Sequence, residues 1–221
     1  MQRFHSALGA TKAVVFDLGG VLIDLHSEAA GRELVDKYGM RTDRFAQLTR
    51  SCFTSRERSI TELAMVGEIA TAQYLEAFLR ECTTQDMEAI TANRLSVIGR
   101  ERADVFAVAK QLREAGLMCC VFSNTIALHW EKLSSRSDYP SLCGFDRIFA
   151  SHLIAHAKPE ANAFSFVADA LNLRLSECLL IDDTPLNVDR AWSAGWRGLL
   201  FRDAASLQHQ LITEGLYNNK A

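Results

Sequence analysis

The chain has 221 residues, of which 48% are hydrophobic and 23% are charged, and its formal net charge is −3. This balance is typical of a folded globular protein and argues against disorder, and the length suits one large domain or two small ones. So small a negative charge gives no general attraction to nucleic acid or to an anionic membrane, and we expect neither as a partner.

The sequence also indicates where the protein resides. No apolar run approaches the roughly 18 residues of a membrane span, and the first dozen residues lack the apolar segment of a secretory signal. The six cysteines include no CxxC pair, and several stand in apolar strand or helix patterns. We therefore expect buried free thiols in a cytoplasmic protein, present as a monomer or a homodimer.

The first predicted element is a buried strand that begins at Ala13 and stops at a carboxylate, Asp17. Open α/β sheets bind their ligands at the carboxyl ends of strands, which is where Asp17 would lie. Gly19 and Gly20 follow at once and let the backbone turn back to present main-chain groups to an anion or a metal. A strand-ending turn with a solvated Asp17 is the alternative.

Residues 26–96 carry three-to-four-residue apolar spacing and few strand signals, which predicts an all-helical segment. Thr71 is the expected N-cap of one of its helices. We expect this segment to be a cap domain over the carboxyl ends of the strands, with residues 1–25 and 97–221 forming the core; one mixed domain without a cap is the alternative. The predicted helices are Ala29–Tyr38, Thr42–Leu48, Ile60–Met65, Thr71–Glu81 and Thr84–Arg94.

After Arg100 strands and helices alternate. Alternation of this kind implies parallel βαβ units, so the predicted fold class is α/β, with a doubly wound, Rossmann-like parallel sheet. The predicted order is helix Arg102–Gly116, strand Met118–Phe122, a strand near Ile148, helix Glu160–Leu171, strand Cys178–Ile181, helix Pro185–Ala194, strand Leu199–Phe201 and a helix from Ala204.

Polar residues stand at several of these strand ends. Ser123-Asn124-Thr125 and Asp182-Asp183 each follow a predicted strand, and Lys158-Pro159-Glu160 precedes a helix. Because the carboxyl ends of parallel strands meet at one edge of a sheet, we expect these residues to share a crevice with Asp17.

The chemistry of this set points to phosphate and a hard cation. Three carboxylates close together raise one another's pKa unless a cation lies between them, and an oxygen-only set suits Mg²⁺. Lys158 and the Ser123 hydroxyl can donate to a phosphate, which leaves Asp17 to act as a nucleophile and form an aspartyl phosphate.

This order of motifs resembles the haloacid dehalogenase-like (HAD) hydrolase superfamily, over nearly the whole chain. The helical insertion resembles that superfamily's cap of the first type. Phe-Asp-Leu-Gly-Gly-Val-Leu around Asp17, Ser-Asn-Thr at 123–125 with His129 four residues on, and Lys-Pro-Glu at 158–160 are similar to the α-D-glucose-1-phosphate phosphatase-like branch.

The resemblance implies a role for each matching residue. Asp17 would be the nucleophile and a Mg²⁺ ligand, together with the Gly19 carbonyl; Asp183 would ligate directly and Asp182 directly or through water. Ser123 and Asn124 would hold the phosphoryl group, and Lys158 would neutralise it and orient Asp17. His129 would contact substrate or pack beneath the cap, and Asn187 would support the acidic pair.

One position departs from the usual phosphatase pattern of the superfamily. A second aspartate, acting as general acid and base, commonly stands two residues after the nucleophile, and here Gly19 stands there. General acid–base catalysis contributes about 10²- to 10⁴-fold in rate, which a glycine cannot supply. Asp24 is a candidate substitute acid, and Arg50, Arg56 and Arg58 are either cap contacts to substrate or a solvated helix face.

The expected function is thus that of a Mg²⁺-dependent phosphatase for a small phosphomonoester, with a sugar phosphate as the predicted substrate. A haloacid dehalogenase is one alternative, although the Asp182-Asp183 pair would have no role in it. A catalytically weak binding protein that keeps the phosphate pocket is another, because Gly19 replaces the second aspartate.

Overall fold

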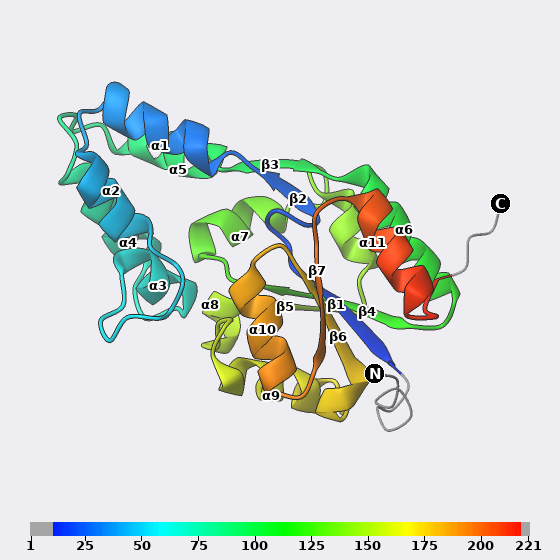
Figure 1. The fold of residues 1–221 in the computed structure, drawn as a ribbon. Coiled ribbons are helices and arrows are strands. Elements are labelled where there is room, and N and C mark those ends of the chain that lie inside the picture. Colours follow the sequence, from blue (N-terminus) through cyan, green and yellow to red (C-terminus); the bar gives the residue numbers. More distant parts are fainter. Residues whose placement is uncertain (1–10, 218–221) are drawn as a thin grey trace.

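The computed structural model describes residues 11–217, so the prediction that a secretory signal is absent lies almost wholly outside the described residues. Five parallel strands form the central sheet in the order β5-β4-β1-β6-β7 (Figure 1). The doubly wound α/β fold is therefore confirmed. The strands are β1 (Ala13–Phe16), β4 (Met118–Ser123), β5 (Arg147–Ala150), β6 (Cys178–Asp182) and β7 (Arg197–Leu200).

Strand β1 occupies the middle of the sheet. Ala13 pairs with Met118 of β4 on one side and with Cys178 of β6 on the other. All four residues of β1 are fully buried, which is why the run is apolar throughout rather than alternating. The backbone N–H of Asp17 donates to the carbonyl of Ile181 at 2.8 Å, so the chain leaves β1 beside the end of β6.

Helices cover both faces of the sheet. Val14 and Phe16 pack with α6 (Ala103–Glu114) and α11 (Ala204–Thr213), whereas Ala13 and Val15 pack with α9 (Ala161–Ala170) and α10 (Pro185–Ser193) (Figure 1). The pleat of a strand sends successive side chains to opposite faces, so one apolar run supplies both cores. Two short helices, α7 (Ala127–Leu133) and α8 (Ser151–Ile154), and two 3-10 turns, Pro140–Gly144 and Leu175–Glu177, complete this part.

The segment between β1 and β4 contains the predicted helical insertion. It leaves the sheet through β2 (Ile23–Leu25) and returns through β3 (Ile98–Glu101), which pair antiparallel (Figure 1). The sequence analysis misses this pair because each strand is short and its partner lies more than 70 residues away. Between them lie α1 (Ser27–Asp36), α2 (Thr42–Thr49), α3 (Ile60–Met65), α4 (Thr71–Leu79) and α5 (Met87–Ser96). The domain boundaries at 26 and 96 stay a prediction.

In this segment one predicted N-cap and one predicted helix start are wrong. Ala70, not Thr71, is the N-cap of α4, and its N–H donates to the Gln73 side chain at 2.9 Å. Helix α5 begins at Met87 rather than Thr84, because the Asp86 carboxylate caps it by accepting from the N–H groups of Glu88 and Ala89.

The cysteine prediction holds in part. All six are free thiols, and Cys82, Cys119, Cys120 and Cys178 are buried. Cys143 is exposed and Cys52 is half-buried, contrary to expectation, because Cys143 lies in a short 3-10 turn and Cys52 in an irregular segment. Among residues 11–217, no helix is both long and apolar enough to cross a membrane.

The helical insertion has its own core and one buried charge. The apolar residues Leu34, Tyr74, Phe78 and Ile90 pack together there. Glu62 of α3 is fully buried, yet its carboxylate accepts from the N–H groups of Phe53 at 2.6 Å and Ser59 at 2.7 Å, and from Arg50 at 3.3 Å. These bonds fix the irregular chain between α2 and α3.

Replacing Glu62 tests this arrangement. Glu62→Ala removes the acceptor of the Phe53 and Ser59 N–H groups and the ionic partner of Arg50, and we expect a loss of about 3 kcal/mol in the free energy of unfolding. Glu76→Ala removes a matched carboxylate from the exposed Arg80 pair and should cost less than about 0.5 kcal/mol. Urea denaturation of both variants measures the difference, and equal losses would contradict the assigned role of Glu62.

Candidate active site

The site lies at the carboxyl ends of three neighbouring strands. Asp17 follows β1, Ser123 ends β4, and Asp182 ends β6, while Lys158 comes from the loop between α8 and α9. The strand order places β1 between the other two, so the polar residues that the sequence separates by more than 100 positions meet here. The convergence expected from a parallel sheet is present in the structure.

Lys158 is the central side chain of the cluster. It is only 1% exposed, and its Nζ lies 2.8 Å from Asp17 Oδ1 and 2.6 Å from Asp182 Oδ2. The ammonium also lies 5.3 Å from the centre of the Phe122 ring. Two carboxylates and an aromatic face therefore compensate a charge that is removed from water.

Asn124 fixes the backbone of Lys158. Its Nδ2 donates to the Lys158 carbonyl at 2.6 Å, and its Oδ1 accepts from the Lys158 N–H at 2.9 Å. This pair of bonds fixes where the lysine side chain starts. These two bonds occupy the side-chain oxygen of Asn124 and one of its two amide hydrogens. Contact between Asn124 and a phosphoryl group stays a prediction.

Three carboxylates face one another beside the lysine. One oxygen each from Asp17, Asp182 and Asp183 lies within 4.8 Å of the other two. Asp182 is fully buried, and its oxygens also accept from the Thr184 N–H at 2.9 Å and from Asn187 Nδ2 at 3.0 and 3.1 Å. The expected support of the acidic pair by Asn187 is confirmed.

The electrostatics of the cluster show an excess of negative charge. Burial raises the pKa of Asp17 to about 7, although Lys158 lowers it, and Asp182 and Asp183 raise it further. Burial, then the charge of Asp182, raises the pKa of Asp183. Burial lowers the pKa of Lys158, but the charges of Asp17 and Asp182 outweigh the effect of burial, so the pKa of Lys158 is raised. Three negative groups against one positive group leave room for a cation.

The turn after Asp17 leaves one carbonyl free. The Leu18 carbonyl accepts from Leu22 and Ile23, and the Gly20 carbonyl accepts from Arg102, whereas no described group donates to the carbonyl of Gly19. Gly20 has φ +81°, and a Cβ there would lie 2.1 Å from Asp183 Oδ2. Only glycine allows the turn to approach the carboxylate this closely.

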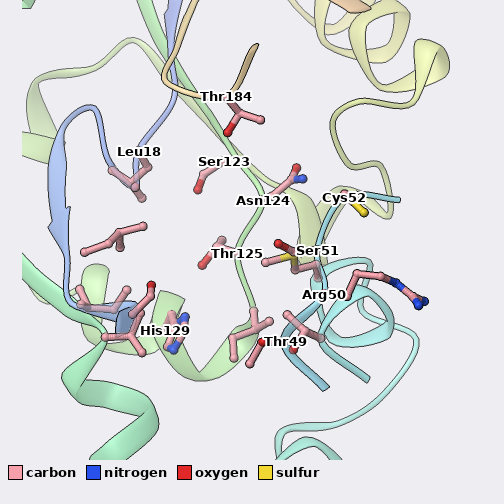
Figure 2. A pocket seen from close by; sticks show the side chains of 18 of the residues that line it. Leu18, Thr49, Arg50, Ser51, Cys52, Ser123, Asn124, Thr125, His129 and Thr184 are labelled. Atoms are coloured by element: carbon pink, nitrogen blue, oxygen red, sulfur yellow. The ribbon is translucent and has the colours of Figure 1, made fainter. Parts of the chain in front are cut away.

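A cavity of about 870 Å³ opens above the cluster, between the sheet and the helical insertion. In Figure 2, Ser123 and Thr125 lie at and just after the end of β4, and Thr49 at the end of α2 and Ser51 and Cys52 after it lie across the cavity from them. Figure 2 shows the side chain of Arg50 extending away from the cavity, toward the Glu62 contact described above. The cavity therefore has walls from both parts of the fold.

His129 lines the cavity, but its Nε2 cannot donate a proton to a molecule bound there. That atom lies 2.9 Å from the Arg94 carbonyl, and because a carbonyl only accepts, Nε2 carries the proton. Burial, together with the charges of Arg94 and Lys132, lowers the pKa of His129 to about 4 despite this bond. The imidazole is therefore neutral at pH 7.

Two other candidates lie elsewhere. Asp24 is exposed on β2 and lies 3.8 Å from Arg102, outside the cavity lining, so the structure does not support it as a substitute acid. Arg56 is exposed, as a solvated position would be, whereas Arg58 pairs with Glu68 and, at 3.2 Å, with Glu160.

The sequence analysis missed the residues that α4 and α5 contribute to the cavity, Tyr74 and Arg94. A signal for Arg94 was present: it follows the buried Ile90 by four residues, which places both side chains on the same helix face.

The fold and the site together define a class: an α/β protein with a lysine-bridged acidic cluster at the carboxyl ends of its strands and a helical insertion that lines the cavity above the cluster. The sequence model of the haloacid dehalogenase-like hydrolase family matches residues 11–195 of this chain. The chain belongs to this family of hydrolases.

Solved structures with the same fold include two of bacterial origin that match almost end to end. A predicted HAD-like family hydrolase from Porphyromonas gingivalis has a TM-score of 0.75 and 21% identity, with coverage of 95% of this chain and 99% of the other. The HAD family enzyme bt-2542 from Bacteroides thetaiotaomicron, crystallised with magnesium and inorganic phosphate, has a TM-score of 0.73 and 22% identity, with coverage of 90% and 99%. At these identities the likeness concerns the fold.

Two other matches are a dehalogenase and a much longer protein. L-2-haloacid dehalogenase from Xanthobacter autotrophicus has a TM-score of 0.60 and 16% identity, covering 94% of this chain and 85% of the other. Acyl-CoA dehydrogenase family member 10 of Mus musculus is 26% identical over 200 residues. That match covers 86% of this chain but only 18% of the mouse protein, so the chain corresponds to a small part of it.

The raised pKa of Asp17 predicts how stability depends on pH in the presence of a chelator. Between pH 3.8 and about 7 the folded protein holds a proton on Asp17 that the unfolded chain has released, so rising pH favours unfolding. We expect the contribution of Asp17 to the free energy of unfolding to fall across this window, and Asp17→Asn to remove that contribution. Urea denaturation of both proteins at pH 5, 6 and 7 measures it, and parallel pH dependences would contradict the assignment.

Proposed function

We propose that this protein is a Mg²⁺-dependent phosphatase that hydrolyses a small phosphomonoester through an aspartyl phosphate on Asp17. The observation that carries the proposal is the cluster itself: three carboxylates lie together at the floor of a cavity, and two of them, Asp17 and Asp182, pair with one buried lysine. A surplus of negative charge beside a nucleophilic carboxylate suits a bound cation and an incoming phosphoryl group.

The donor set fits Mg²⁺. It consists of oxygen atoms only, from Asp17, Asp183 and the unengaged Gly19 carbonyl, as a hard cation requires. Asp182 is already engaged by Lys158, Thr184 and Asn187, so it would support the ion through water. When bound, the ion would supply charge that favours ionised Asp17 and neutralises the phosphoryl oxygens.

The residues of the chain would then carry out the transfer. A carboxylate oxygen of Asp17 attacks phosphorus while Lys158 holds Oδ1, the ester P–O bond breaks, and the leaving oxygen takes the electron pair. Lys158 and the Ser123 hydroxyl donate to the phosphoryl oxygens, where charge develops. Water then attacks the aspartyl phosphate, releases inorganic phosphate and restores the carboxylate.

The comparisons support this proposal over dehalogenation. The neighbour bt-2542 was crystallised with magnesium and inorganic phosphate, the two components that the proposed reaction needs. Displacement of halide from carbon has no use for a divalent cation, and it would leave the Asp183 carboxylate beside Asp17 without a function. A sugar phosphate remains the substrate predicted from sequence, and the hydroxyl groups of Thr49, Ser51 and Thr125 around the cavity can bond sugar hydroxyls.

A phosphomonoester panel assayed with Mg²⁺ and with chelator tests the function. We expect phosphate release with Mg²⁺ only, abolition by Asp17→Asn, and a decrease of about 10²-fold or more in Lys158→Met. Lys110→Met removes an exposed lysine and should leave the rate unchanged. Chelator-resistant turnover, or halide release from 2-haloacids, would contradict the proposal, and phosphate binding without turnover would indicate the binding protein instead.

Position 19 yields a further prediction about the leaving group. With glycine there, the leaving oxygen departs largely unprotonated, so the rate should fall steeply as the pKa of the leaving alcohol rises. Gly19→Asp should increase turnover of alkyl phosphates by about tenfold or more and that of aryl phosphates least.

The structure allows this substitution. Gly19 does not adopt positive φ, and its added Cβ would meet only the flexible end of Leu25, at 2.8 Å. Gly19→Asn, which has the same size but no acidic proton, is the matched control. A series of phosphomonoesters measured on all three proteins gives the slopes, and a flat dependence in the unsubstituted protein would show that another group supplies the proton.

A further inference from the structure

Arg94 of α5 is a buried cation at the cap side of the cavity. It is 5% exposed and belongs to the cavity lining. Its Nε donates to the Tyr74 hydroxyl at 3.3 Å, and its guanidinium stacks 4.7 Å from the centre of the Phe78 ring. Nη1 has one marginal contact, 3.5 Å from Asn93 Oδ1, and Nη2 forms no hydrogen bond within residues 11–217.

Every other buried charged side chain of the described residues has an ionic partner. Glu62 pairs with Arg50, Lys158 with Asp17 and Asp182, and Glu177 with Lys12 and Arg174. Arg94 forms no ion pair in the same part of the chain, and arginine does not lose its proton when buried. A guanidinium that is largely removed from water and has no anion is costly, and the aromatic contact offsets only part of that cost; its Nη2 is not closed off, so a ligand in the cavity can reach it.

Other cations near Arg94 are not available to share a ligand. His129 is neutral, and the Nζ of Lys132 donates to the carbonyls of Leu95 and Ile98 at 3.1 and 3.0 Å. A lone guanidinium with free N–H groups matches one carboxylate, which is planar and carries a single charge. A second phosphate would bring about two charges to one cation.

We propose that Arg94 binds a carboxylate of the substrate, so that the substrate is a phosphomonoester that carries a carboxylate away from its phosphoryl group. This inference rests on the proposed phosphatase function, because Asp17 and Arg94 line one cavity. Its volume of about 870 Å³ falls within the usual range of about 300–1,000 Å³ for a pocket that holds one small molecule.

Binding of non-hydrolysable analogues tests the inference without requiring turnover. Isothermal titration with Mg²⁺ present compares benzylphosphonate, 4-carboxybenzylphosphonate and the corresponding 1,4-bis(methylphosphonate). We expect the carboxylated analogue to bind at least tenfold more tightly than benzylphosphonate. Equal affinity of these two, or tighter binding of the bisphosphonate than of the carboxylate, would overturn the proposal.

The variants assign the preference to Arg94. Arg94→Met should reduce the ratio of the two affinities to about one while benzylphosphonate binds as before, and Arg94→Lys should keep part of the ratio. Arg80→Met removes an exposed cation from α4, so it should leave the ratio unchanged. If Arg94→Met does not fold, Arg94→Lys decides, because it keeps the charge but loses the planar fork; an unchanged ratio there would contradict the proposal.

The two proposals can fail separately. If no phosphomonoester is hydrolysed but the analogue preference disappears in Arg94→Met, the phosphatase proposal fails and the carboxylate site stands. If phenyl phosphate and 4-carboxyphenyl phosphate are hydrolysed with equal kcat/KM in the presence of Mg²⁺, the phosphatase proposal stands and the carboxylate site fails.

Discussion

The position of one ammonium group holds the site together. Lys158 Nζ bridges carboxylates from the ends of β1 and β6, and its backbone is fixed by Asn124 after β4. Removing Lys158 would leave the fully buried Asp182 carboxylate without an ionic partner, which costs more than the loss of a surface pair. The geometry of three strand ends is therefore set by charge compensation as well as by the sheet. The same ammonium supports the proposed reaction, because a fixed donor needs no reorganisation when phosphoryl charge develops.

The helical insertion and the sheet each line part of the cavity, and they contribute different groups to it. The carboxyl ends of the central strands supply the acidic cluster and Ser123, which are groups suited to the chemistry common to all phosphomonoesters. The helical insertion supplies a different set of lining residues, which includes Arg94, a cation without an ion pair among the described residues. An ion pair between Arg58 and Glu160, two residues after Lys158, joins the cap to the loop that carries the lysine. Under the proposed function, the groups that would select the substrate and the groups that would carry out its reaction belong to separate parts of the chain.

Sequence patterns predicted most of the sheet and the lower half of the site. A strand buried on both faces is apolar throughout, and a polar residue at its end is conspicuous, so Asp17, Ser123 and Asp182 could be found from the chain alone. The β2–β3 pair could not, because its pairing depends on contacts between distant short segments. The lack of an ionic partner for Arg94 could not be predicted either. The sequence places Arg94 on a buried helix face, but whether an anion lies near it depends on how the helical insertion packs against the core.

Gly20 links two segments that lie more than 160 residues apart. Its missing side chain makes the space into which the Asp183 carboxylate extends, since a Cβ would lie 2.1 Å from Oδ2. Positions 20 and 183 are thus constrained as a pair: a larger residue at 20 requires a shorter or displaced one at 183, and with it a different donor set. A side chain at position 20 would have to adopt the left-handed backbone conformation and would displace the Asp183 carboxylate from its place in the acidic cluster.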